Sequence, residues 1–544
     1  MSRRGTSNRP ARTTLIGVLV ALLVGALVAS ATGPATGEPR RPPVTRTTVA
    51  GIDVDRATIP QLQRAMDRGR LSSARLTRFY LQRIARLDGR LDAVVTTNRQ
   101  VLAQARAADR ARARGDSRPL LGIPVLVKDN VNTTGMPTTA GSLALRGSTP
   151  PDAFVVRRLK AAGALVLGKT NLSEWANFRG AQSSSGWSAV GGQTSNAHAL
   201  DRNPCGSSSG SGVAVSADLA TVAIGTETDG SIVCPAGQNG VVGVKPTVGL
   251  ASRTGIVPIS PEQDTAGPMT RNVTDAAVVL SALTGVDRED PATADQVGRV
   301  ERDYAGGLDR AALRGARIGV WREGTSGVSP ETDAVVDRTV RRLRALGATV
   351  VEGADIPIEA AYDDETTALE HEFKQAIGDY LQRWTAPRYP KTLADLIRFN
   401  RANAATELRW FGQETFESAQ ARGPLTDPAY VEARSNARRV AREGIEETLA
   451  ADDLDAIVAP TNSPAWTTDL VNGDHFLLGS SSPSAIAGYP NVTVPAGYAA
   501  GLPVGVSFIG PRWGEQDLLS LAYSWERATQ VRTKPRLLAT VPGS

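Results

Sequence analysis

The chain has 544 residues, more than an average domain, yet large α/β enzymes often form a single unit of this length. With 41% hydrophobic and 21% charged residues, it has enough apolar side chains for a sizeable core. The formal net charge is +6, but residues 1–31 contain four arginines and no acid. Removing these four from the 61 basic residues leaves 57 against 55 acidic ones, a net charge of +2. No basic block with interleaved aromatic residues occurs, so nucleic acid is not an expected partner.

The N-terminus has the three parts of a secretory signal peptide. Four arginines within residues 3–12 precede an apolar run, 15–28, and the small residues Ala29-Ser30-Ala31. We therefore expect residues 1–31 to be a signal peptide and the protein to be secreted or held in the cell envelope, without stable membrane association after cleavage. The alternative is an uncleaved membrane anchor, since the apolar run approaches the length that spans a bilayer. Residues 32–50, rich in Pro, Arg, Thr and Gly, predict a flexible leader.

The remaining chain, 51–540, alternates between two kinds of pattern. Apolar residues recur at helical spacing from Thr58 to Ala113, and a helix is predicted from Ser329-Pro330 to Gly347. Short apolar runs predict buried strands at 123–127, 164–167, 219–224, 317–321 and 456–459. This alternation predicts an α/β fold, a sheet layered by helices. The segment of about 287–449 gathers aromatic and charged residues in helical stretches, and forms either a cap over the substrate or an ordinary helical layer.

Two serine clusters lie in glycine-rich turns, at 205–212 and at 225–231. Glycine lets the backbone adopt conformations that a side chain forbids, and such a turn can direct several N–H groups at a developing oxyanion. Lys128 ends another apolar run, where burial would lower its pKa and free its lone pair. Two serines and a lysine are what a hydrolase needs when it has no catalytic histidine.

The three histidines, His198, His371 and His475, lie in no recognisable catalytic or metal-binding motif. We expect them to be structural or exposed to solvent. A competing interpretation takes Gly206 to Gly210 as the G-x-S-x-G nucleophile elbow, with Ser208 as the nucleophile. That motif needs a strand directly before it, whereas residues 201–205 are typical of a turn, which disfavours this interpretation.

Three motifs, in order, resemble the amidase signature family: GIPVLVKDN with Lys128, CGSSSGSG with Ser207, and GTETDGSIVCP with Ser231. The resemblance implies a large mixed β-sheet covered on both faces by α-helices. It also implies a Ser–Ser–Lys triad in which Ser231 is the nucleophile, Ser207 the bridging serine, held by a cis peptide bond, and Lys128 the base. No metal or organic cofactor is implied. The oxyanion hole would consist of backbone N–H groups of Thr228, Asp229, Gly230 and Ser231.

The chain departs from the commonest family pattern at a few positions. Cys205 and Ser209 stand where glycines are usual, and Glu227-Thr228-Asp229 replaces Asp-Thr-Gly. These differences resemble the peptide amidase branch, whose members remove the C-terminal amide from peptides. We therefore expect hydrolysis of a carboxamide, of a peptide or a small molecule, to acid and ammonia through a seryl acyl-enzyme.

Three alternatives to a peptide amidase stay open at this point. One is a general aliphatic or aryl amidase. Another is a subunit of a tRNA-dependent amidotransferase, which the signal peptide and the near-neutral charge disfavour. The third is a non-enzymatic peptide-binding protein, which the intact Lys128, Ser207 and Ser231 disfavour.

The two cysteines, Cys205 and Cys234, each lie near a candidate catalytic serine. Export permits a disulfide, which requires Cα atoms within about 7 Å of each other. The sequence leaves the bridge open, and two buried thiols packed behind the site are the preferred interpretation.

Overall fold

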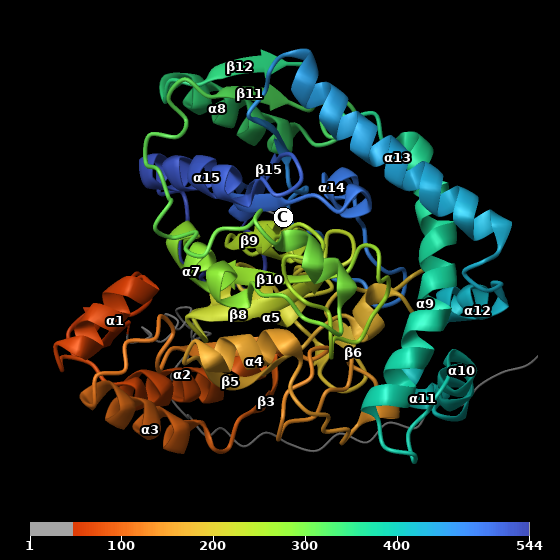
Figure 1. The fold of residues 1–544 in the computed structure, drawn as a ribbon, viewed down its shortest axis with the longest axis horizontal. Helices are drawn as coiled ribbons and strands as arrows, with labels where there is room; N and C mark the ends of the chain where they lie inside the picture. The colour runs from red at the N-terminus through yellow and green to blue at the C-terminus, as the bar shows by residue number, and fades with distance from the viewer. Residues whose placement is uncertain (1–46, 543–544) are drawn as a thin grey trace, which may run out of the picture. The chain divides into compact units, whose positions relative to one another are not determined.

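The core is one eleven-stranded sheet in a computed structural model that describes residues 47–542. From one edge to the other (Figure 1), its strands are β12 (Thr349–Glu352), β11 (Arg317–Val320), β13 (Ala456–Pro460), β15 (Leu502–Ile509), β14 (Asn491–Ala499), β9 (Val242–Lys245), β10 (Thr265–Thr270), β8 (Val222–Glu227), β4 (Pro124–Lys128), β5 (Leu165–Thr170) and β3 (Val94–Thr97). Two hairpins lie outside it: β1 (Thr48–Val49) with β2 (Ile52–Asp53), and β6 (Trp187–Ser188) with β7 (Gly192–Gln193).

The sheet is mixed, as the family resemblance implies. β4 runs parallel to β5 and β8, and β11 runs parallel to β12 and β13. The other neighbouring strands are antiparallel. The central strands are buried along almost their whole length, so the sheet needs cover on both faces.

Helices provide that cover. They are α1 (Ile59–Asp67), α2 (Ser73–Leu87), α3 (Val101–Ala113), α4 (Phe154–Ala161), α5 (Ser209–Ser216), α6 (Val233–Gln238), α7 (Val273–Leu283), α8 (Pro330–Ala345), α9 (Tyr362–Trp384), α10 (Leu393–Ala402), α11 (Ala404–Glu407), α12 (Glu414–Ala421), α13 (Pro428–Ala451), α14 (Ser482–Ala487) and α15 (Glu515–Thr529).

The two faces of β9 show which helices lie where. Val242 and Val244 share one apolar cluster with α7, α8 and α15. Gly243, whose side-chain position alternates with theirs, faces α6, because a Cβ atom there would lie 2.7 Å from Ala236. The expected sheet with helices on both faces is thus confirmed.

Local sequence signals place several elements correctly. Ser329 caps α8 by accepting a hydrogen bond from the backbone N–H of Thr332, and Pro330 opens the helix, as the sequence predicts. The five predicted strands correspond to β4, β5, β8, β11 and β13. One prediction is wrong: the helical pattern from Thr58 to Ala113 is interrupted by β3. Its sequence, Val-Val-Thr-Thr, is entirely β-branched and pairs with β5 at the edge of the sheet.

The segment expected as a possible cap, 287–449, has two structural parts. β11, α8 and β12 extend the central sheet, whereas α9 to α13 lie beside it (Figure 1). Apolar side chains of α9, α10 and α12 pack against Trp175, Val257 and Ile259. The expected signal peptide and most of the leader lie outside the described residues. Within 47–542, no helix is long and apolar enough to cross a membrane.

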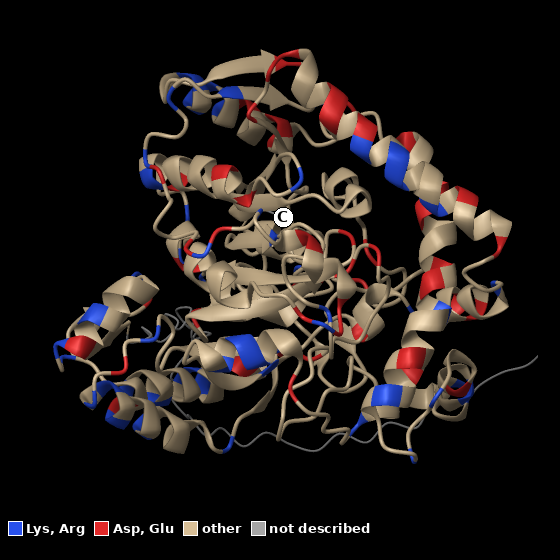
Figure 2. Ribbon diagram, viewed as in Figure 1, with Lys and Arg blue, Asp and Glu red and all other residues tan. Residues whose placement is uncertain are grey.

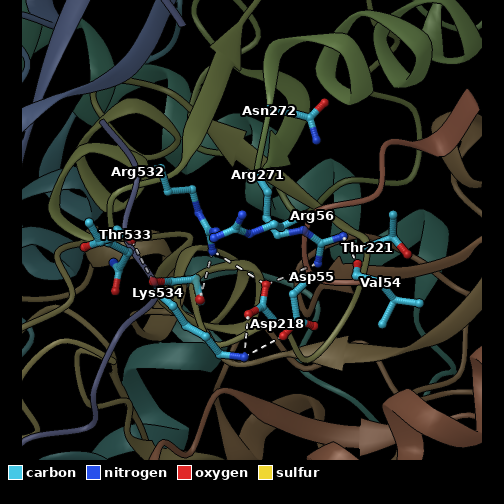
Figure 3. Close-up of polar contacts among 12 residues, drawn as sticks. Val54, Asp55, Arg56, Asp218, Thr221, Arg271, Asn272, Arg532, Thr533 and Lys534 are labelled. Atoms are coloured by element: carbon cyan, nitrogen blue, oxygen red, sulfur yellow. Dashed lines mark hydrogen bonds and ion pairs between the residues drawn. The ribbon is translucent and has the colours of Figure 1, made fainter. Parts of the chain in front are cut away.

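A buried ion network lies beside the N-terminal end of strand β8 (Figure 3). Asp218, fully buried before β8, lies 3.4 Å from the guanidinium of Arg271, which follows β10. Two residues of the C-terminal tail, Arg532 and Lys534, approach the same carboxylate at 3.6 Å. Lys534 also pairs with Asp55 of the N-terminal segment. The network therefore joins both ends of the described chain to the central sheet.

Replacing Asp218 with asparagine should destabilise the fold, because buried cations lose their counter-charge. Loss of one partner from a buried ion pair costs about 3–5 kcal/mol. Urea unfolding measures this difference. The matched control is Asp53→Asn, since the Asp53 side chain is 42% exposed and lies 4.0 Å from an exposed Arg56. It should change stability by less than about 1 kcal/mol. Equal unfolding midpoints for the two variants would contradict this assignment.

Candidate active site

Lys128 is the last residue of β4, which lies between β8 and β5 in the sheet, and its side chain is completely buried. Its Nζ lies 2.7 Å from Ser207 Oγ, 2.9 Å from Thr226 Oγ1 and 3.1 Å from the Thr226 carbonyl oxygen. Burial lowers the pKa of Lys128 to about 7, although the negative charges of Glu227 and Asp264 raise it. A neutral amine has two N–H bonds and one lone pair, so it can donate twice to Thr226 and accept the hydroxyl proton of Ser207.

Ser207 lies in the loop before α5, fully buried, and the peptide bond between Gly206 and Ser207 is cis. Its neighbour Ser208 is placed differently. Ser208 Oγ donates to the Thr226 carbonyl oxygen at 3.0 Å and accepts from the Thr226 N–H at 3.2 Å. Ser208 is thus bound to the backbone of β8, while Ser207 faces Lys128. This geometry disfavours the nucleophile elbow.

Ser231 follows a tight turn after β8. Gly230 has φ +75°, a left-handed conformation that strains a side chain, and a Cβ atom there would lie 3.0 Å from Ser481 Oγ. Glu227 fixes the end of the turn, because its carboxylate accepts the N–H groups of Ile232 at 2.7 Å and Val233 at 3.0 Å.

The turn also supplies hydrogen-bond donors. Within residues 47–542, none of the backbone N–H groups of residues 228–231 donates to another residue. The side chain of Asp229 accepts a hydrogen bond from Ser481. Four consecutive N–H groups without a protein acceptor suit the binding of a negative oxygen.

The two cysteines form a disulfide, with Cα atoms 6.0 Å apart. The preferred interpretation of two free thiols is therefore wrong. The bridge joins Cys205, two residues before Ser207, to Cys234, three residues after Ser231. It ties together the two segments that carry the serines, and sequence spacing alone could not show that these segments meet.

Ser207 and Ser231 line one small cavity. The cavity has room for a single water-sized molecule, whose centre can occupy a volume of about 10 Å³. The wall contains both polar and apolar side chains. It comprises Asn130, Ala176, Ser207, Thr226, Thr228, Ser231, Arg253, Ile256, Val257, Ile259, Asp264 and Thr265.

Asp264 is the acidic residue of this wall. Its Oδ1 accepts the hydroxyl of Thr228 at 2.6 Å, and its Oδ2 accepts the N–H groups of Ile259 at 2.8 Å and Ser260 at 3.0 Å. Burial raises the pKa of Asp264 to about 6, so the carboxylate is ionised at neutral pH. Nothing near Asp264 in the sequence resembles a site motif. Asn130 and Thr226 lie inside the motifs of Lys128 and Ser231, yet their places in the wall become visible only in three dimensions.

Helices α9 and α13 are tied to the turn through Gln263. Its amide donates to Glu365 of α9 at 2.7 Å and to the Thr228 carbonyl oxygen at 3.4 Å, and it accepts from Arg434 of α13 at 2.7 Å. Arg434 also forms two hydrogen bonds to Glu372 of α9, at 2.7 and 2.8 Å. Acidic and basic residues lie along both helices (Figure 2). These helices are therefore held next to the candidate oxyanion turn.

None of the three histidines lines the cavity. Burial lowers the pKa of His198 to about 4, and His371 bonds within α9 to the Thr367 carbonyl oxygen at 2.8 Å. His475 is exposed beside Asp469. In residues 47–542, no group of three or more His, Cys, Asp or Glu side chains is arranged to hold a metal ion.

Comparison with known proteins identifies the family. The Amidase family model matches residues 75–519. The crystal structure of native peptide amidase from Stenotrophomonas maltophilia superposes with a TM-score of 0.84 at 52% identity, covering 88% of this chain and 98% of that one. An amidase family protein from Bacillus anthracis has a TM-score of 0.81 at 36% identity, covering 89% and 93%. A glutamyl-tRNA(Gln) amidotransferase subunit from Acinetobacter baumannii is 33% identical, covering 90% and 99%. With its three signature motifs arranged around one cavity, the chain belongs to the amidase signature family and is an amide-hydrolysing enzyme.

Proposed function

We propose that this amidase removes the C-terminal amide from peptides, giving the free acid and ammonia. The observation that carries the chemistry is the fully buried Lys128, whose Nζ lies 2.7 Å from Ser207 Oγ beside the cavity that Ser231 also lines. The substrate class is supported by 52% identity to the peptide amidase of Stenotrophomonas maltophilia. The departures at Cys205, Glu227 and Asp229 support the same branch.

In this proposal, neutral Lys128 takes the hydroxyl proton of Ser207, and Ser207 takes the proton of Ser231. Ser231 Oγ attacks the amide carbonyl, whose oxygen becomes negative and is bound by backbone N–H groups of residues 228–231. The C–N bond then breaks as Ser207 returns a proton to the nitrogen, which leaves as ammonia. Water hydrolyses the ester to Ser231 by the same relay. One oxyanion donor is worth about 3–4 kcal/mol of the barrier.

Export is a further part of the proposal. Its support is the basic and apolar pattern of residues 1–31 with its small-residue cleavage site, and the Cys205–Cys234 disulfide, which is typical of oxidising compartments. An exported enzyme meets extracellular peptides. If residues 1–31 are not cleaved, they would hold the same enzyme at the membrane, and N-terminal sequencing of the mature protein decides between the two.

Likeness to the amidotransferase protein of Acinetobacter baumannii gives a second candidate function. A protein of that kind works with partners and tRNA, whereas residues 32–544 carry a net charge of only +2. Stable co-purification with other subunits would favour this candidate.

Replacing Ser231 with alanine should lower ammonia release by more than about 1,000-fold, because no nucleophile is left at the turn. Ser208→Ala is the matched control, since Ser208 bonds to the backbone of β8, and it should keep activity within about 10-fold. A reagent that acylates active serines should label Ser231 in the wild type. An active Ser231→Ala variant beside an inactive Ser208→Ala variant would reverse the assignment.

The activity should depend on pH through Lys128. Below its pKa of about 7 the lysine is protonated and its lone pair is occupied, so kcat/KM should rise tenfold per pH unit up to about pH 7 and then level off. Lys128→Met, which keeps the length without the amine, should lower kcat by about 10²–10⁴-fold. His198→Gln should preserve both the rate and the pH profile. A histidine variant as inactive as Lys128→Met would contradict the lysine mechanism.

The peptide amide should be the preferred substrate. Contacts with residues away from the reacting amide should raise kcat/KM for a peptide amide at least about 10-fold above that for acetamide. The same peptide as free acid should release no ammonia. Purified mature protein and an ammonia assay suffice for the comparison. Faster release from small aliphatic or aryl amides than from any peptide amide would make the enzyme a general amidase.

A further inference from the structure

The leaving nitrogen of the substrate must lie close to Ser207. In the proposed mechanism, on which this inference rests, the hydroxyl that receives the proton of Ser231 also returns it to the nitrogen. The cavity between the two serines satisfies that requirement, because both line it. Its room for one water-sized molecule fits an –NH₂ group or ammonia, whereas a nitrogen that carries a carbon chain needs more space.

Asn130 lines this cavity and has an acceptor oxygen that no other described residue uses. The residue follows β4 at the second position after Lys128 and is 3% exposed. Its Nδ2 donates to Thr226 Oγ1 at 2.9 Å. This hydrogen bond fixes the orientation of the amide and leaves Oδ1 buried without a hydrogen-bond partner among the described residues. An unsatisfied buried acceptor is destabilising, and a ligand that donates a hydrogen bond to it removes this cost.

A second acceptor lies in the same wall. Asp264 Oδ1 accepts one hydrogen bond, from Thr228, and a carboxylate oxygen has two lone pairs. Asp264 lines the cavity with Asn130 and both serines. Two residues of the wall thus each have an oxygen with spare acceptor capacity, which matches in number the two N–H bonds of an unsubstituted carboxamide.

We propose that Asn130 Oδ1 and Asp264 Oδ1 accept the two N–H bonds of the substrate's amide nitrogen, so that the site selects unsubstituted amides. As the nitrogen becomes pyramidal, these two hydrogen bonds direct its lone pair toward Ser207, which protonates it. Asn130 is then a substrate-binding residue for the leaving group. Esters, whose leaving oxygen has no N–H, gain nothing from it.

The test compares a peptide amide with the methyl ester of the same peptide, so that the acyl group is constant. In Asn130→Ala, kcat/KM for the amide should fall about 10-fold or more relative to that for the ester, the effect of one lost hydrogen bond to a reacting group. Ester turnover also reports that the variant is folded.

Asn132→Ala is the matched control. Asn132 is as buried as Asn130 and lies in the same segment, but it accepts from the hydroxyl of Tyr380 and does not line the cavity. Its amide-to-ester ratio should stay within about threefold of the wild type. Equal losses for amide and ester in Asn130→Ala, or the same ratio change in Asn132→Ala, would overturn the assignment.

The size of the cavity is tested separately with the N-methylamide of the same peptide. The wild type should hydrolyse it at least about 10-fold more slowly than the unsubstituted amide, and comparable rates would overturn the cavity as the leaving-group site. If the wild type prefers small amides to peptide amides, the proposed substrate class fails. The Asn130 comparison then proceeds unchanged with acetamide and methyl acetate.

Discussion

The burial of one lysine is the constraint on which the rest of this structure depends. An amine serves as a base only when it is neutral, and water would keep Lys128 charged over the physiological range. Its position at the end of β4, a strand paired on both sides in a sheet with helices on both faces, removes that water.

Burial alone would lower the pKa of Lys128 further, and nearby carboxylates oppose it. Glu227 and Asp264 raise this pKa, but each accepts two or more hydrogen bonds from its surroundings, which hold it at a fixed distance. The pKa of about 7 is therefore a balance between desolvation and these two charges. The same carboxylates shape the turn after β8 and the wall of the cavity, so charge and geometry are set by the same residues.

The sequence predicts the residues that share a motif better than those that meet only in the fold. Lys128, Ser207 and Ser231 lie in local patterns with recognisable chemistry. Asp264 enters the site from the residue before β10, a strand hidden by Gly267 and Pro268, and β14 and β15 also contain prolines that weaken a strand pattern. The disulfide could not be predicted, because it depends on how closely two loops approach. Asn130 is visible in its motif, but its free oxygen follows from the neighbouring hydroxyl of Thr226.

The order of synthesis determines when the ion network around Asp218 can form. Asp55 and Asp218 are synthesised long before Lys534, whose Nζ pairs with both of their carboxylates. A nascent chain that has not yet reached Lys534 cannot complete this network, however much of the sheet it contains. The carboxylates of Asp55 and Asp218 therefore gain their last cationic partner, Lys534, only near the end of synthesis. A chain truncated before Arg532 would keep every residue around Lys128 and still lack the clamp between the two ends of the described chain.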